Sequence, residues 1–286
     1  MNKRIFALLL AAVLVLALTG CAKKEYSEGN PKTDLLATTQ PVYQLTCALT
    51  DGTGLSVGLL ISESVSCLHD YTLTVSQMEM IEQSGLVLES GLGLENFMED
   101  VLRGKTRIDI SRNLDTLPGE DGADPHWWLD PMRYKQAAEL AAQELGAQYP
   151  EFADQISENL AAFCEKLSSL QDYGEQALSD LSCRQLVTFH DGFSYFADAF
   201  SLTIAAAMEV ESGSEPSAKE LEEIISIVED NQIPAVFTEV NGETGAAEVV
   251  AGEAGCAVRT LDMAISNRDY FAAMRQNIDI VKEALG

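Results

Sequence analysis

The sequence predicts an α/β protein in which two domains with mainly parallel sheets are joined by one long helix. Short apolar segments typical of buried strands alternate with helical segments in both halves of the chain. Between the halves, residues 151–178 keep a helical pattern for 28 residues, with no proline and no glycine before Gly174. A helix of that length extends about 40 Å, which is enough to run along two domains.

The first domain is expected at residues 34–148. Its predicted strands are short runs rich in Leu, Ile and Val, and its predicted helices carry apolar residues three and four positions apart. We expect strands at 35–39, 55–61, 85–88 and 107–110, and helices at 42–49, 78–83, 94–102 and 132–145.

The linker helix is assigned to residues 149–181 and the second domain to residues 182–286. Ser217 and Glu220 have the spacing of a capping box, which marks the start of a helix that extends to about Asn231. The other elements are expected as strands at 185–189, 202–208, 235–239 and 257–261, and as helices at 193–200, 244–252 and 269–285.

Residues 1–20 have the features of a signal peptide. Two basic residues precede an apolar run of 14 residues, Ile5–Leu18, which is too short for a membrane-spanning helix. The run ends in Leu18-Thr-Gly-Cys21, which resembles the bacterial lipobox and implies cleavage before Cys21 and a lipid on that cysteine. A secretory signal with an incidental cysteine is the alternative. We expect residues 21–33 to be a flexible tether that holds the protein on the extracytoplasmic face of the cell membrane.

The formal charge of −27 excludes nucleic acid as a partner, because phosphate binding needs a basic surface. Loss of residues 1–20, which carry Lys3 and Arg4 and no acidic residue, would take the charge to −29. Charged residues at 22% and apolar residues at 47% are ordinary values for a protein with sizeable cores.

The five cysteines beyond Cys21 do not indicate thiolate chemistry. No two of them have C-x-x-C spacing, so neither a zinc–thiolate site nor a thioredoxin motif is expected. Their number is odd, so at least one stays unpaired within a monomer, and the pairing is open. The five are Cys47, Cys67, Cys164, Cys183 and Cys256, with Cys47 and Cys67 the first pair to test.

The three histidines of the chain are expected to meet at one metal ion. His126 lies in Ala123-Asp-Pro-His-Trp-Trp-Leu-Asp-Pro131, where the prolines exclude a continuous helix and the tryptophans can hold the imidazole in one orientation. His69 lies in the segment after strand 55–61, and His190 immediately follows strand 185–189. Ligands collect at the carboxyl ends of parallel strands. If these edges of the two predicted sheets face each other, they form a cleft between the domains.

Two carboxylates lie at the same kind of position. Asp262 immediately follows strand 257–261, and Glu239 closes strand 235–239. Imidazole nitrogens suit zinc, copper, nickel and iron, and three histidines with one aspartate complete a four-coordinate zinc site. We expect Glu239 to support the site rather than to bind the metal. Taken one by one, these residues also fit ordinary roles in a surface loop, a strand end, a packed cluster or a helix cap.

Several motifs resemble those of the metal receptors, or solute-binding proteins, of bacterial ABC importers for zinc and manganese. Asp124-Pro-His-Trp-Trp-Leu-Asp-Pro131 resembles the signature D-P-H-x-W-L-D-P of that family, and His190-Asp-Gly-Phe-Ser-Tyr-Phe-Ala197 resembles its H-x-A-F-x-Y-F-A stretch. Ser84–Glu95 is similar to A-D-L-V-x-x-N-G-x-x-L-E, and Val236–Glu239 and Thr260–Asp262 match the late strand ends of the family. The resemblance covers nearly the whole chain beyond residue 33.

The resemblance implies two Rossmann-like domains, a rigid linker helix with modest closure on binding, and an ABC permease as partner of a monomeric receptor. It also implies that His69, His126, His190 and Asp262 bind the metal. Manganese receptors usually carry Glu where His190 stands, so zinc is expected and manganese or iron is the alternative. The chain departs from the family in two places: Ser66–Val75 lacks the usual prolines, and Ile110–Ala123 is short and contains no histidine.

The alternatives to a metal receptor are a zinc hydrolase and a surface adhesin. A zinc hydrolase would need an open coordination position and a general base, whereas Asp262 would fill the fourth position and no H-E-x-x-H motif is present. We therefore expect binding without catalysis. A surface adhesin stays open as a second role, because some proteins of this family are described as adhesins.

Overall fold

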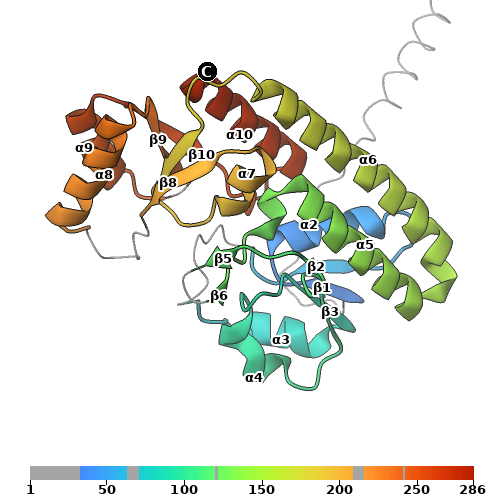
Figure 1. Cartoon of the computed structure of the whole chain (residues 1–286). Helices are drawn as coiled ribbons and strands as arrows, with labels where there is room; N and C mark the ends of the chain where they lie inside the picture. Colours follow the sequence, from blue (N-terminus) through green and yellow to red (C-terminus); the bar gives the residue numbers. More distant parts are fainter. Residues whose placement is uncertain (1–32, 63–70, 120–121, 209–215, 241) are drawn as a thin grey trace, which may run out of the picture. The chain divides into compact units, whose positions relative to one another are not determined.

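The computed structural model describes residues 33–62, 71–119, 122–208, 216–240 and 242–286 (Figure 1). Lys32–Gly286 forms one compact unit. His69, Cys67, the predicted signal peptide and Cys21 lie outside the described residues.

The N-terminal sheet is parallel, with strand order β2-β1-β3-β4. Its strands are β1 (Leu35–Ala37), β2 (Val57–Leu59), β3 (Leu86–Glu89) and β4 (Arg107–Asp109). Each lies within or one residue beyond a predicted segment. Strand β1 lies between β2 and β3, and all three of its residues are fully buried. This burial is why the strand is a continuous apolar run without alternation.

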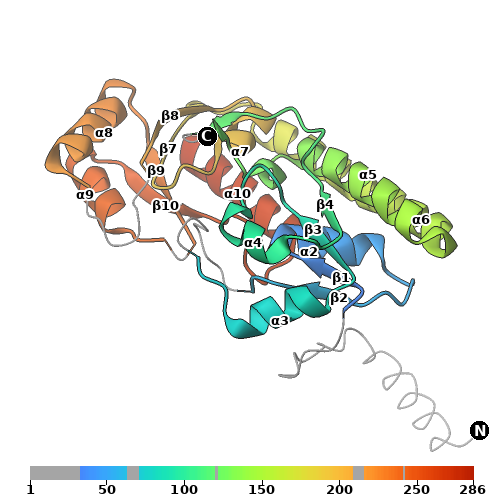
Figure 2. The ribbon, with the colours of Figure 1, turned by 90° about the horizontal axis from the view of Figure 1, so that it is seen from below.

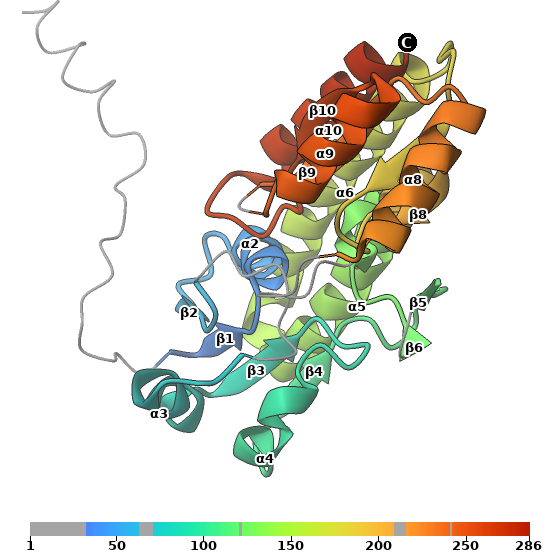
Figure 3. The same cartoon turned by 90° about the vertical axis from the view of Figure 1, so that its left-hand side faces the viewer.

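Helices cover both faces of this sheet (Figure 3). On one face, α3 (Val75–Gln83), the short helix α4 (Glu99–Leu102) and the 3₁₀ turn η1 (Asn96–Met98) pack on β1 and β3. On the other face lie α2 (Gln40–Leu49) and α5 (Pro131–Gln148). The prediction of one helix over 94–102 is wrong, because the chain forms η1 and a single turn of α4 there.

Two details of the N-terminal half were not found from the sequence. Helix α3 starts three residues before the predicted Met78, because Thr74 and Gln77 form a capping box, in which Thr74 N donates to Gln77 Oε1 at 2.9 Å. A small antiparallel pair, β5 (Pro118–Gly119) and β6 (Gly122–Ala123), precedes the proline-bracketed segment.

The C-terminal sheet repeats the arrangement with parallel strand order β10-β9-β7-β8. Helices α8 (Ala218–Asp230) and α9 (Gly245–Ala254) pack on one face, and α7 (Ser194–Ala199) and α10 (Tyr270–Leu285) belong to the core on the other. Its strands are β7 (Gln185–Thr188), β8 (Thr203–Ala207), β9 (Ala235–Glu239) and β10 (Ala257–Leu261). The predicted limits of β9 and β10 are confirmed, as is the capping box of Ser217 and Glu220.

Helix α6 (Ala153–Ala177), preceded by the 3₁₀ turn η3 (Pro150–Phe152), is the predicted long helix. Its 25 residues extend about 38 Å at 1.5 Å per residue. It runs beside α5 and also contacts α2 and α10, so it packs on helices from both halves (Figures 1 and 2). Gly174 is required for close packing, since a Cβ there would lie 2.2 Å from Phe200 Cε1. The fold class is confirmed, whereas the domain boundaries at residues 148 and 182 stay predictions.

An aromatic cluster lies where these helices meet. The Tyr134 ring centroid lies 4.5 Å from that of Tyr270, 5.6 Å from that of Phe163 and 5.7 Å from that of Trp127. The two buried tyrosine hydroxyls donate to carbonyls, Tyr134 to Pro41 at 2.6 Å and Tyr270 to Trp128 at 2.8 Å. The cluster therefore combines apolar burial with satisfied polar groups.

Tyr270→Phe is expected to lower the free energy of unfolding by about 1–3 kcal/mol, because it leaves the Trp128 carbonyl without this buried donor. Urea denaturation monitored by circular dichroism measures it. Tyr173→Phe is the matched control, since its hydroxyl bonds Asp279 at an exposed site and should change the stability by less than about 0.5 kcal/mol. Equal stabilities of Tyr270→Phe and wild type would contradict the role of this hydroxyl.

Candidate metal centre

The segment that carries His126 is fixed by hydrogen bonds to three separate parts of the chain. Trp127 Nε1 donates to Ser90 O, just after β3, at 2.9 Å, and Trp128 Nε1 donates to Met263 O, just after β10, at 2.8 Å. The Tyr195 hydroxyl, on α7, donates to the Asp124 carbonyl at 2.9 Å. The segment forms a 3₁₀ turn, η2 (Trp127–Leu129), and leads into α5 at Pro131, and these three bonds fix its position.

His126 is oriented by Asp124. Its Nδ1 lies 2.8 Å from Asp124 Oδ1, and its backbone N–H donates to the same oxygen at 2.9 Å. The Asp124 side chain is only 4% exposed. A carboxylate on one imidazole nitrogen sets the ring so that the other nitrogen can bind a metal, as in many zinc sites. Sequence reasoning did not assign this role to Asp124, although its place two residues before the histidine was the available signal.

His190 lies beside His126, with ring centroids 5.4 Å apart and planes at 81°. It follows β7 in the chain and is 8% exposed. Burial, with a smaller contribution from the neighbouring His126, lowers the pKa of His190 to about 4. The imidazole is therefore neutral at neutral pH, which is the form that binds metals.

The Nε2 atom of His190 is buried and has no hydrogen-bond partner among the described residues. Such an atom costs free energy unless something else satisfies it. Gly192 packs closely against this side of the ring, because a Cβ at this position would lie 2.9 Å from His190 Nε2 and 2.5 Å from Met263 Cε. A buried, neutral imidazole nitrogen of this kind is a suitable metal ligand.

Asp262 lies at the end of β10 and is held at its backbone by Asn277 of α10. Its N–H donates to Asn277 Oδ1 at 2.8 Å, and Asn277 Nδ2 donates to the Asp262 carbonyl at 2.7 Å. Asn277 is fully buried. Asp262 Oδ1 accepts from Ala264 N at 2.8 Å, so the carboxylate bonds the loop after the strand rather than a helix. Asn277 was missed because nothing in the sequence links positions 15 residues apart on a strand end and a helix.

Glu239 closes β9 and is 6% exposed. In the register of the sheet it pairs with Leu261, so Glu239 and Asp262 come from neighbouring strand ends at one edge. Among the described residues, no three His, Cys, Asp or Glu side chains lie close enough to share a metal ion. The structure thus brings His126 and His190 together, and the four-ligand set with His69 stays a prediction.

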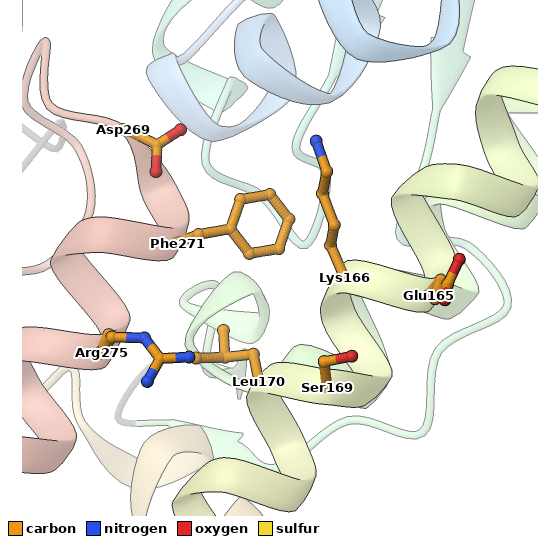
Figure 4. A pocket seen from close by; sticks show the side chains of 7 residues that line it. All are labelled: Glu165, Lys166, Ser169, Leu170, Asp269, Phe271 and Arg275. Carbon is orange, nitrogen blue, oxygen red and sulfur yellow. The ribbon is translucent and has the colours of Figure 1, made fainter.

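A cavity of about 480 Å³ lies between α6 and the start of α10 (Figure 4). The two basic side chains that line the cavity lie next to aromatic rings. Lys166 Nζ is 5.9 Å from the Phe271 ring centroid, and the Arg275 guanidinium is 3.9 Å from the Tyr173 ring centroid. Its lining contains no histidine, so it does not extend the metal centre; it comprises Glu165, Lys166, Ser169, Leu170, Asp269, Phe271 and Arg275.

Comparison with known proteins decides the family. Residues 35–284 match the family described as zinc-uptake complex component A, periplasmic (ZnuA). The chain belongs to this family. The zinc-binding lipoprotein AdcA of Streptococcus pneumoniae (strain ATCC BAA-255 / R6) is 27% identical over 306 residues, which cover 97% of this chain and 60% of AdcA. The chain thus spans about 60% of the length of the curated relatives it matches first.

Two solved structures share the fold. A zinc-bound deletion mutant of ZnuA superposes with a TM-score of 0.80 at 28% identity, covering 90% of this chain and 99% of that chain. The laminin-binding protein Lmb of Streptococcus agalactiae gives a TM-score of 0.79 at 24% identity, covering 89% of this chain and 100% of Lmb. The second likeness concerns the fold alone.

The lowered pKa of His190 predicts a pH dependence of stability in metal-free protein. Between pH 6.5 and 4 the unfolded chain binds a proton at this residue and the folded chain does not, so the free energy of unfolding falls as the pH falls. The expected loss is about 2 kcal/mol between pH 7.5 and pH 5.

His190→Gln should remove this loss, which is measured by urea denaturation of both proteins in chelator at the two pH values. Burial raises the pKa of Glu95 to about 7 and gives the opposite slope, but Glu95 is present in both proteins and cancels in the difference. Identical pH slopes for wild type and His190→Gln would contradict the buried, neutral imidazole.

Proposed function

We propose that this protein is an extracytoplasmic receptor that binds zinc and delivers it to an ABC import permease. The observation that supports this most is that His126 lies against the buried His190, whose Nε2 has no hydrogen-bond partner among the described residues. Membership of a zinc-uptake family and the zinc-binding names of relatives support the choice of cargo.

The proposed ligands are His69, His126, His190 and Asp262. His126 would bind through Nε2, because Asp124 occupies its Nδ1. His190 would bind through its buried Nε2, and Asp262 would supply an oxygen from the same carboxyl edge of the C-terminal sheet. Neutral imidazoles with one carboxylate suit zinc better than manganese, which prefers oxygen ligands. Glu239 would support Asp262 from the adjacent strand end.

The proposed action is binding and release without catalysis. The relatives reported above are named as binding proteins or a zinc-uptake component, and four protein ligands would fill a tetrahedral zinc site and leave no position for a reactive water. The likeness to a laminin-binding protein gives no support for adhesion here, since it concerns the fold alone.

We further propose that a lipid on Cys21 anchors the receptor to the cell membrane. Residues 1–20 would be removed, and residues 21–33 would tether the binding unit, of which 34–148 and 182–286 would be the two domains and 149–181 the linker. The lipoprotein name of AdcA supports this assignment. In the described part of the chain, no helix has the length and apolar composition needed to cross a membrane.

Zinc binding is tested by competition with a chromogenic chelator. Wild type should bind one zinc ion per chain, and His126→Ala and His190→Ala should each weaken binding by about 100-fold or more, since each removes a ligand. His190→Glu should shift preference from zinc toward manganese. Wild-type affinity in His190→Ala, with one ion per chain, would refute the site.

Substitutions at two glycines, one beside His190 and one in open space, test whether His190 Nε2 faces the metal. Gly192→Ala places a methyl group 2.9 Å from His190 Nε2 and should weaken zinc binding by about tenfold, although every ligand is present. Gly252→Ala is the matched control, because a Cβ at that position meets no atom within 4 Å. Equal zinc affinities of the two variants would show that His190 Nε2 does not face the metal.

The anchor is tested in a bacterial host by replacing Cys21. Cys21→Ala protein should lose lipid labelling and accumulate as precursor or in the released fraction, whereas Cys164→Ala protein, changed at a cysteine on α6, should stay in the membrane fraction. Membrane retention of Cys21→Ala with unchanged mass and lipid labelling would exclude the anchor.

A further inference from the structure

A cation lies beside the proposed carboxylate ligand. Arg268 Nη1 is 4.0 Å from Asp262 Oδ2, and the Asp262 side chain is 6% exposed. The other oxygen, Oδ1, already accepts a hydrogen bond from Ala264 N at 2.8 Å. The oxygen nearest to Arg268 is therefore the one that has no such bond to the loop and is left for a metal.

The backbone of Arg268 is held in place from the other half of the molecule. Gln44 of α2 donates from Nε2 to the Arg268 carbonyl at 2.9 Å, and Gln44 Oε1 accepts from Tyr270 N at 2.9 Å. A single side chain thus clamps the two ends of the turn that enters α10. These two bonds fix the backbone position from which the Arg268 side chain reaches Asp262.

The side chain itself is less constrained than the backbone. It is 42% exposed, and 4.0 Å is longer than the 2.7–3.2 Å of an N–H···O hydrogen bond. The contact is thus a charge pair that Arg268 can give up by swinging toward solvent, without a change in the backbone.

We propose that Arg268 is the counter-ion of Asp262 that an incoming zinc ion must displace, and that it sets how tightly zinc is held and how fast it is released. The inference rests on the proposed function and adds a residue to it. A positive charge beside a ligand carboxylate opposes binding of a second positive charge to the same oxygen. Arg268 would therefore weaken zinc binding and favour release.

The test compares zinc affinity and the dissociation rate of Arg268→Gln, Arg268→Lys and wild type, by chelator competition and stopped-flow transfer to excess chelator. Arg268→Gln should bind zinc about tenfold tighter and release it correspondingly slower, while Arg268→Lys, which keeps the charge, should stay within about threefold of wild type. Arg275→Gln is the matched control for loss of one positive charge, because Arg275 packs on the Tyr173 ring.

A double-mutant cycle separates this role from a general charge effect. In an Asp262→Asn background, Arg268→Gln should change zinc affinity by less than about twofold, because the pair it would break is already gone. The inference is overturned if Arg268→Gln binds zinc no more tightly than wild type. It is also overturned if Arg268→Gln raises zinc affinity by the same factor in the Asp262→Asn background. Either result leaves the proposed function standing, because wild type still binds zinc. Absence of zinc binding by wild type refutes the proposed function and this inference together.

Discussion

The candidate metal centre depends on two indole N–H groups that attach one short segment to two sheets. Trp127 donates to the chain just after β3 of the N-terminal sheet, and Trp128 donates to the chain just after β10 of the C-terminal sheet. Both rings are almost fully buried, so each bond is made where an unpaired group would be costly. Because the tryptophans are adjacent in the chain, the two sheet edges are held at a distance that the segment itself determines.

A second set of contacts reinforces this junction through charge. Arg133, at the start of α5, bonds Asp130 on its own helix cap and Asp198 on α7, at 2.5 Å and 2.7 Å. Its guanidinium also lies 5.0 Å from the Tyr195 ring centroid. The bond to Asp130 is buried, whereas the Asp198 side chain is half exposed, so the first of the two is the stronger. In a chain with a formal charge of −27, one of the few cations is used to join carboxylates from both halves.

Desolvation gives the site its chemical character. Burial keeps the imidazole of His190 neutral, while Asp124 sets the orientation of His126. A surface of net negative charge attracts cations over long distances, but it cannot select among them. Selection would come from the nitrogen donors and from the geometry in which they are held. Arg268 adds a local opposing charge, so capture and release would be governed by different residues.

The sequence by itself determined most of the fold. Short apolar runs predicted every strand of both parallel sheets, and the uninterrupted helical pattern over 151–178 predicted α6. These predictions succeeded because the signals are local and repeated along the chain. It failed at 94–102, where the buried carboxylate of Glu95 accepts from Ser90 N and Gly91 N and a 3₁₀ turn forms.

At the site, the sequence pointed to His126 and His190, since histidine is rare in this chain and both follow predicted strands. Only the tertiary structure showed that their rings meet, that Asn277 holds Asp262, and that Arg268 lies beside it. The first two contacts join residues far apart in the chain or on separate elements, and the third joins two residues of the loop between β10 and α10. No periodicity records them, because they are decided by how the two sheets and α6 pack.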